Sequence, residues 1–245
     1  MHVITKILAA TALLLVPAAA VAASDAPPRI AVIDSGVART STLDASIETE
    51  IDMVDGRAPF STKSSHGTSV ATVLVRSAHR PVRIVSLRID RDGQCDKRVC
   101  RMEPAAIVAA VRKAIEMKVD VINLSIDTPF NAQLYVLLQN ASNAGIAVVM
   151  AAGNEPTVPR GLRYAQTIGT RFWLVGAKDG QGRPAEFSAR PKADCACQFV
   201  WRPGVEIDTQ DRKGQPIHES GTSFAAPVVA AEIADRMGTT QIAAR

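Results

Sequence analysis

Residues 119–154 read VDVINLSIDTPFNAQLYVLLQNASNAGIAVVMAAGN, and this stretch decides the fold class. It begins with a short apolar run, continues with a helix-like segment that closes at Gly145, and ends with a second apolar run. Strands that are apolar on both faces are typical of parallel sheets, because helices cover such sheets on both sides. The stretch therefore predicts two parallel strands joined by a helix.

The same alternation extends toward the N-terminus. Apolar strand patterns occur at residues 29–34 (RIAVID) and 82–89 (VRIVSLRI), and helical patterns occur at 66–78 and 103–118. Together they predict an α/β protein, a three-layer sandwich with a central, mostly parallel sheet. We find no repeat, linker or low-complexity tract after the N-terminal segment, so we expect one domain over residues 24–245.

The N-terminal segment has the pattern of an export signal. Lys6 precedes an uncharged run over residues 7–23, near whose end Ala20 and Ala22 form an A-x-A pattern. This predicts a signal peptide over residues 1–23, and hence a periplasmic or secreted protein without membrane contact after cleavage. An uncleaved membrane anchor is the alternative, but the run is short for a span and contains a proline.

The charge and the cysteines narrow the class further. The net charge of +4 is spread along the chain without a basic stripe, so we expect no nucleic-acid partner. Four cysteines in an exported chain favour disulfides over a zinc site, which would need four converging thiolates. A local Cys95–Cys100 pair and cross-pairing between two loops are both open, because a Cys-x-Cys bridge is strained. The disulfide candidates are Cys95, Cys100, Cys195 and Cys197.

Polar residues stand where the predicted strands end. Asp34 ends one strand, and Ser125 and Asn154 follow two others. Ligands of parallel sheets bind beyond the carboxyl ends of the strands, so we expect these residues to share one edge. A carboxylate in this place can orient a base, and an amide can donate to a developing oxyanion.

Two further residues lie at the starts of predicted helices. His66 opens one helix and is followed by Gly67, which leaves the imidazole uncrowded. Ser223 opens another, where backbone N–H groups and the helix dipole favour negative charge. His218 precedes Ser223 closely and is a second candidate base, whereas His79 falls in a predicted surface turn. No histidine follows Ser223, which excludes the α/β-hydrolase arrangement.

Four segments now resemble the signature segments of one family, the subtilisin-like serine peptidases or subtilases. The resemblance covers residues 29–237 and rests on VIDSGV, HGTSVA, AAGN and SGTSFAAP, in that chain order. It implies the subtilisin-like fold and a serine endopeptidase that acts on protein or peptide substrates through an acyl-enzyme. The alternative is an inactive peptide-binding module of the same fold, but no signature residue is missing.

The resemblance also implies a role for each matching position. Ser223 is the nucleophile, His66 its base, Asp34 the residue that orients His66, and Asn154 an oxyanion donor. Ser220 matches a non-catalytic place. Pro227 is expected in the first turn after Ser223, where a missing N–H costs little. Substrate-binding residues implied by the resemblance are Ser125, Ile126, Asp127, Ala151, Ala152 and Gly153.

Asp127 departs from the glycine-rich stretch that the family usually has there. It either favours a basic substrate side chain or faces water and only shapes a loop. We expect no cofactor; the resemblance implies that calcium can bind, but no Asp-rich loop identifies a site. Few residues lie between the predicted signal peptide and Asp34, which leaves no room for a folding propeptide. We therefore expect unaided folding or a separate folding partner or inhibitor.

Overall fold

The computed structural model describes residues 26–54, 62–95, 100–128 and 130–239. The predicted signal peptide at 1–23 lies outside these residues. The fold centres on a sheet of seven strands that pair in parallel throughout. In sheet order the strands are β2 (Ile47–Asp52), β3 (Arg83–Arg88), β1 (Arg29–Asp34), β6 (Val121–Leu124), β7 (Ala147–Ala151), β8 (Phe172–Lys178) and β9 (Phe199–Pro203).

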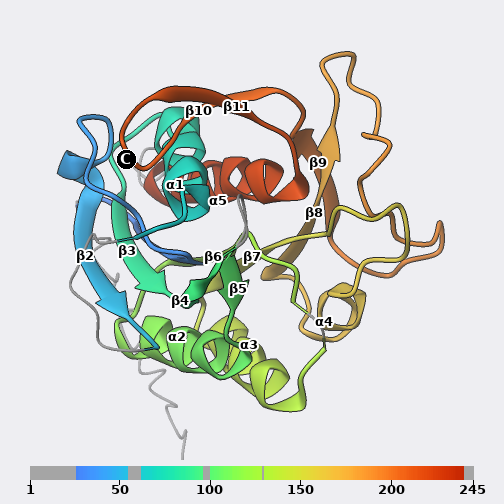
Figure 1. The fold of residues 1–245 in the computed structure, drawn as a ribbon. Helices are drawn as coiled ribbons and strands as arrows, with labels where there is room; N and C mark the ends of the chain where they lie inside the picture. The colour runs from blue at the N-terminus through green and yellow to red at the C-terminus, as the bar shows by residue number, and fades with distance from the viewer. Residues whose placement is uncertain (1–25, 55–61, 96–99, 129, 240–245) are drawn as a thin grey trace, which may run out of the picture.

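Helices cover both faces of this sheet (Figure 1). One face carries α1 (His66–Ser77) and α5 (Thr222–Thr239). The other face carries α2 (Pro104–Glu116), α3 (Ala132–Asn143) and the short α4 (Leu162–Thr167). The predicted three-layer α/β sandwich with a parallel sheet is therefore confirmed.

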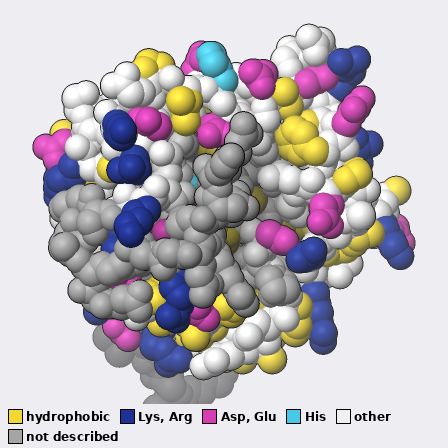
Figure 2. All heavy atoms as spheres, in the orientation of Figure 1, with side chains coloured by type: hydrophobic (Ala, Val, Ile, Leu, Met, Phe, Trp, Pro, Cys, Tyr) yellow, Lys and Arg dark blue, Asp and Glu magenta, His cyan; other side chains and the backbone are white. Residues whose placement is uncertain are grey.

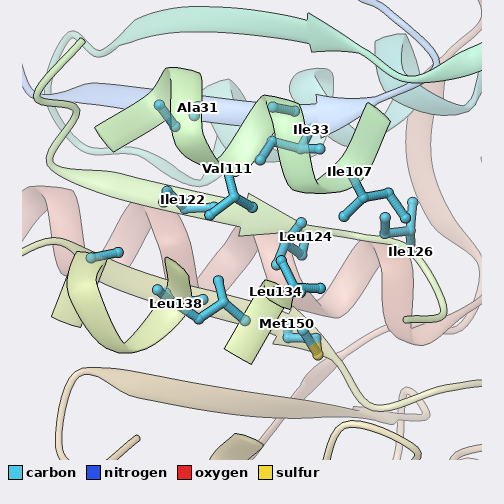
Figure 3. Packing of buried hydrophobic residues seen from close by; sticks show 14 of the residues in the cluster. Ala31, Ile33, Ile107, Val111, Ile122, Leu124, Ile126, Leu134, Leu138 and Met150 are labelled. Carbon is cyan, nitrogen blue, oxygen red and sulfur yellow. The ribbon is translucent and has the colours of Figure 1, made fainter. Parts of the chain in front are cut away.

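Apolar strands form because each one has helices on both sides. Ile33 of β1 is buried against α2 and α3, while its neighbours Ile30 and Val32 are buried against α1 and α5. Figure 3 shows Val111 of α2 and Leu138 of α3 pointing toward the sheet strands in this core. Successive strand residues point to opposite faces, so a strand buried on both sides needs an unbroken apolar run.

Two antiparallel hairpins and a short 3-10 helix lie outside the central sheet. They are β4 (Asp90–Cys95) with β5 (Cys100–Met102), β10 (Ile207–Gln210) with β11 (Pro216–Glu219), and η1 (Asp44–Ser46). The β10–β11 hairpin packs on α1 (Figure 1). The Ser69 hydroxyl donates to the Gln210 carbonyl over 2.9 Å, and the Thr209 hydroxyl donates to the Ser69 carbonyl over 2.8 Å.

The cysteine pairing differs from one of the open alternatives. Cys195 is joined to Cys197 with an S–S distance of 1.99 Å, so these two do not cross-pair with the other loop. Their Cα atoms are 5.3 Å apart, which lies within the usual range for a disulfide. Cys95 and Cys100 are paired residues in the β4–β5 hairpin, and the structure describes their backbone only.

Charges are interspersed on the surface. Figure 2 shows acidic and basic side chains alternating over the visible face. None of the helices in the described ranges is long and apolar enough to cross a membrane.

Candidate active site

The candidate site lies at the carboxyl edge of the sheet, where the strand order turns around β1. Strands β2 and β3 lie on one side of β1, and the later strands lie on the other. Asp34 ends β1, Ser125 follows β6 directly, and Asn154 stands three residues beyond β7. Such a reversal opens a crevice beyond the strand ends, which is the usual ligand position in open α/β sheets.

Asp34 is a fully buried carboxylate that is committed to His66. Its Oδ1 atom lies 2.8 Å from His66 Nδ1 and accepts a hydrogen bond from the Ser35 backbone N–H over 2.7 Å. Its Oδ2 atom has no hydrogen-bond partner among the described residues. A buried carboxylate with one unpartnered oxygen is costly, so a positively charged His66 ring beside it is favoured.

Gly67 allows α1 to start close enough for this pair to form. A Cβ atom on Gly67 would stand 2.4 Å from the Gly36 carbonyl oxygen and 3.2 Å from Asp34 Cβ. The Gly67 N–H also donates to the Ser35 hydroxyl over 3.0 Å. The glycine thus relieves a clash with the backbone that follows β1, a stronger reason than space for the imidazole alone.

The environment of His66 raises its pKa above the ordinary value of 6.5. Burial of the ring lowers this pKa, but the charge of Asp34 and its hydrogen bond, together with the charge of Glu219, outweigh burial. The His66 side chain keeps 23% of its surface exposed, and its ring lies 5.6 Å from that of Phe224. Phe224 directly follows Ser223, so helix α5 starts beside the imidazole.

Ser223 is the second residue of α5 and is 9% exposed. The start of this helix directs backbone N–H groups and the positive end of the dipole toward the serine. No hydrogen bond between Ser223 and His66 is formed among the described residues. Hydrogen bonds between a nucleophile and its base are often long before substrate arrives.

The Ser223 carbonyl is held by β6 rather than by its own helix. Pro227 is the sixth residue of α5, and its missing N–H would have bonded this carbonyl. Instead the Ser125 hydroxyl donates to it over 2.8 Å and accepts from the Asn123 amide over 2.9 Å. Pro227 thus lies inside the helix, one turn after Ser223, and the Ser125 hydroxyl replaces the lost bond.

Thr222 fixes the orientation of Asn154. Asn154 Oδ1 accepts hydrogen bonds from the Thr222 N–H over 2.8 Å and from its hydroxyl over 3.0 Å, while the Gly153 N–H donates to that hydroxyl over 3.1 Å. With its oxygen occupied, Asn154 keeps the Nδ2 hydrogens for another acceptor. Sequence reasoning missed Thr222, although a threonine at a helix start is a recognised hydrogen-bonding residue.

Asn154, Thr222 and Ser223 border one pocket of about 250 Å³. Its lining residues are Asp127, Ala151, Gly153, Asn154, Glu155, Thr222 and Ser223. The candidate nucleophile and the candidate oxyanion donor therefore face the same space. A smaller pocket adjoins it and includes Ala152 and Arg160.

The other predicted residues take different places. Ser125 is fully buried beneath Ser223, and Ile126 belongs to the core (Figure 3). His218 is exposed on β11 with its Nδ1 atom 2.9 Å from Asp208, and Ser220 hydrogen-bonds Glu206. Neither His218 nor Ser220 hydrogen-bonds Ser223.

Most of the chain matches one known protein family. The sequence model described as the subtilase family matches residues 26–238. The chain belongs to the subtilase family. The curated relatives of this subtilase described next share 27% to 30% sequence identity with it over the matched residues.

Three curated proteins are similar to this subtilase. It is 28% identical to the thermostable alkaline protease of Halalkalibacterium halodurans over 207 residues, which cover 82% of this chain and 54% of the relative. It is 30% identical to subtilisin-like protease 3 of Pseudogymnoascus destructans over 70% of this chain and 43% of the relative. It is 27% identical to subtilisin DY of Bacillus licheniformis over 82% and 73%. The chain thus spans about half the length of the first two relatives.

Solved structures share the fold. A cold-adapted subtilisin-like serine proteinase superposes with a TM-score of 0.73 at 22% identity, over 86% of this chain and 75% of that one. The prenylagaramide maturation protease PagA superposes with a TM-score of 0.68 at 21% identity, over 89% and 78%. These likenesses establish the subtilisin-like fold of this chain.

A buried arginine beside the site was also missed by sequence reasoning. Arg88 ends β3 directly opposite Asp34 and is fully buried. Its guanidinium lies 3.1 Å from Asp52, 3.7 Å from Glu50 and 3.9 Å from Asp90. An arginine in an apolar strand pattern, with acidic residues nearby in sequence, was the available signal. Among the described residues no group of His, Cys, Asp or Glu side chains is arranged to hold a metal.

Proposed function

We propose that this subtilase is a serine endopeptidase that hydrolyses peptide bonds. Ser223 Oγ attacks the carbonyl carbon while His66 Nε2 takes the hydroxyl proton, and the carbonyl oxygen becomes an oxyanion. The C–N bond then breaks, and His66 gives its proton to the leaving amine. Water attacks the resulting ester by the same route in reverse, which releases the acid product and restores Ser223.

One observation carries this proposal. Ser223 and the oriented Asn154 amide line one pocket, and the Asp34–His66 pair at 2.8 Å lies beside the helix start that carries Ser223, where the His66 ring contacts Phe224. The charge of Asp34 favours the protonated imidazole that forms during the reaction, and it holds the other nitrogen free to accept.

The oxyanion donors follow from the same geometry. Asn154 Nδ2 and the Ser223 backbone N–H would donate to the oxygen that gains charge in the transition state. Thr222 supports this role because it takes up the amide oxygen, so the donor is held before substrate binds. A pre-oriented donor needs no reorganisation during the reaction, which is the source of its catalytic effect.

We further propose that the protein is exported. The pattern over residues 1–23 supports a cleaved signal peptide. The Cys195–Cys197 disulfide supports an oxidising compartment, where such bonds persist.

A fluorophosphonate probe tests the proposed activity. We expect covalent labelling of the folded protein, with the adduct located on Ser223 by mass spectrometry, because the probe reacts only with an activated serine hydroxyl. A folded protein that binds peptides but shows neither labelling nor cleavage would support the alternative, an inactive peptide-binding module.

The oxyanion donor can be tested by Asn154→Ala. We expect kcat to fall about 10²–10³-fold with a small change in KM, because the donor acts mainly in the transition state. Steady-state kinetics on a fluorogenic peptide would measure the effect. Thr222→Val keeps the amide but removes one of its anchors, so its kcat should fall less. A larger loss in Thr222→Val than in Asn154→Ala would contradict this division of roles.

The pH profile depends on Glu219. Catalysis needs a neutral His66 in the free enzyme, so kcat/KM should rise with pH through a midpoint above 6.5. Glu219→Gln removes a negative charge that raises the pKa of His66, so the midpoint should move to lower pH. Asp208→Asn on the same hairpin is the control and should leave the midpoint in place. An unmoved midpoint in Glu219→Gln would show that its charge does not reach His66.

A further inference from the structure

The pocket beside Ser223 has an acidic wall. Asp127 and Glu155 both line it together with Ser223 and Asn154. Arg160 does not line this pocket but lines the smaller adjoining one, which Asp127 and Glu155 also line. Asp127 and Glu155 therefore lie between the two pockets, with Ser223 in the larger pocket and Arg160 in the smaller one.

Arg160 compensates this wall only in part. Its Nη1 atom lies 3.0 Å from Asp127 Oδ2, and its Nη2 atom lies 3.8 Å from Glu155 Oε2. Two carboxylates share one guanidinium, so the group keeps a net negative charge. All three side chains are more than half exposed, at 55% for Arg160, 51% for Asp127 and 71% for Glu155. A ligand can therefore reach the carboxylates from the Ser223 side.

The remaining walls suit a long, straight side chain. Ala151 and Gly153 carry little or no side chain, so they leave the pocket open along its length. The methylene stem of a lysine or arginine can lie on such a surface while its charged head reaches an acceptor. A short side chain would make neither the contact along its stem nor the ion pair at its end. An acidic side chain would be repelled by the two carboxylates.

We propose that this pocket selects lysine or arginine at the substrate residue N-terminal to the scissile bond, and that Asp127 and Glu155 are the selecting residues. The inference rests on the proposed peptidase function. Arg160 is a positioning residue, because it holds the two carboxylates from the far side and competes for their charge. The proposal adopts the first of the two interpretations of Asp127, because Asp127 lines the pocket that Ser223 also lines.

Four fluorogenic peptides test this selectivity. They differ only in that one residue, which is Lys, Arg, Leu or Glu. We expect the wild-type protein to cleave the Lys and Arg peptides with a higher kcat/KM than the Leu peptide, and the Glu peptide most slowly. Ratios between peptides are the readout, so a general loss of activity in a variant does not count.

The variants separate charge from structure by the sign of their effects. In the double variant Asp127→Asn with Glu155→Gln, the Lys-to-Leu ratio should fall on the order of 10-fold, since exposed charges act weakly. In Arg160→Gln the same ratio should rise, because a competing cation is removed. Glu116→Gln, which removes one negative charge at the C-terminal end of α2, is the matched control and should leave the ratio unchanged.

Two outcomes would overturn the inference. One is a Lys-to-Leu ratio in wild type that does not exceed one, and the other is a ratio that moves in the same direction in the acidic and Arg160 variants. Failure of the proposed function looks different: no peptide is cleaved and the fluorophosphonate probe does not label Ser223.

Discussion

Ser223→Ala is expected to lower kcat by on the order of 10⁶-fold, the size of loss measured for the corresponding serine in subtilisin, itself a subtilase. Without the hydroxyl oxygen of Ser223, the ester bond of the acyl-enzyme cannot form. His66 and Asp34 then have no proton to move, so they cannot compensate. What remains is catalysis by binding and by the Asn154 donor, which predicts a small residual rate above that in water.

The fold of this variant should persist. Neither the Asn154–Thr222 bonds nor the Ser125 bond to the Ser223 carbonyl uses the serine hydroxyl. Circular dichroism and the melting temperature would confirm this, while active-site titration and peptide kinetics measure the loss. Ser220→Ala is the matched control, since its hydroxyl bonds Glu206 in an exposed loop. Substantial activity in a folded Ser223→Ala variant would exclude it as the nucleophile.

Asp34→Asn is expected to lower kcat by about 10⁴-fold with little change in the fold. The asparagine has nearly the same shape, but its amide can donate to His66 Nδ1. That bond favours the tautomer whose Nε2 carries the hydrogen, and this nitrogen cannot then accept the Ser223 proton. The variant also loses the charge that stabilises protonated His66 during the reaction.

A second readout on the same variant separates this role from a structural one. The charge of Asp34 raises the pKa of His66, so an NMR titration should show a lower His66 pKa in Asp34→Asn. The control is Asp235→Asn, because Asp235 lies 2.8 Å from Nδ1 of the exposed His79 in the same kind of pair. It should lose no activity. A His66 pKa that does not fall, together with a destabilised fold, would contradict the proposed role of Asp34.

The sequence was most informative where burial alone decides the structure. Strands β1, β3, β6 and β7 are apolar on both faces, so their type and parallel pairing could be predicted. Strand β2 could not, because it reads IETEID and is only partly apolar. Its Glu50 is buried against Arg88 of β3, and no local pattern predicts a compensating charge from a distant strand.

The site shows the same division. That Asp34 and Asn154 stand at one edge follows from strands that run in parallel, which the sequence predicts. The orientation of the Asn154 amide depends on Thr222, and the wall of the pocket depends on Arg160. Both contacts join loops that meet only after the chain has folded, so hydrophobic periodicity carries no information about them.

The bond from Ser125 to the Ser223 carbonyl has a consequence for motion. A helix normally ties its first turn to the next, so displacement of the helix would carry its first residues along. Pro227 removes that tie at Ser223, and the 2.8 Å bond attaches the serine to the end of β6. The carbonyl of the proposed nucleophile is therefore tied to the residue after β6 instead of to the next turn of α5. We expect fraying of α5 beyond Pro227 to disturb the position of Ser223 less than it would in a helix without the proline.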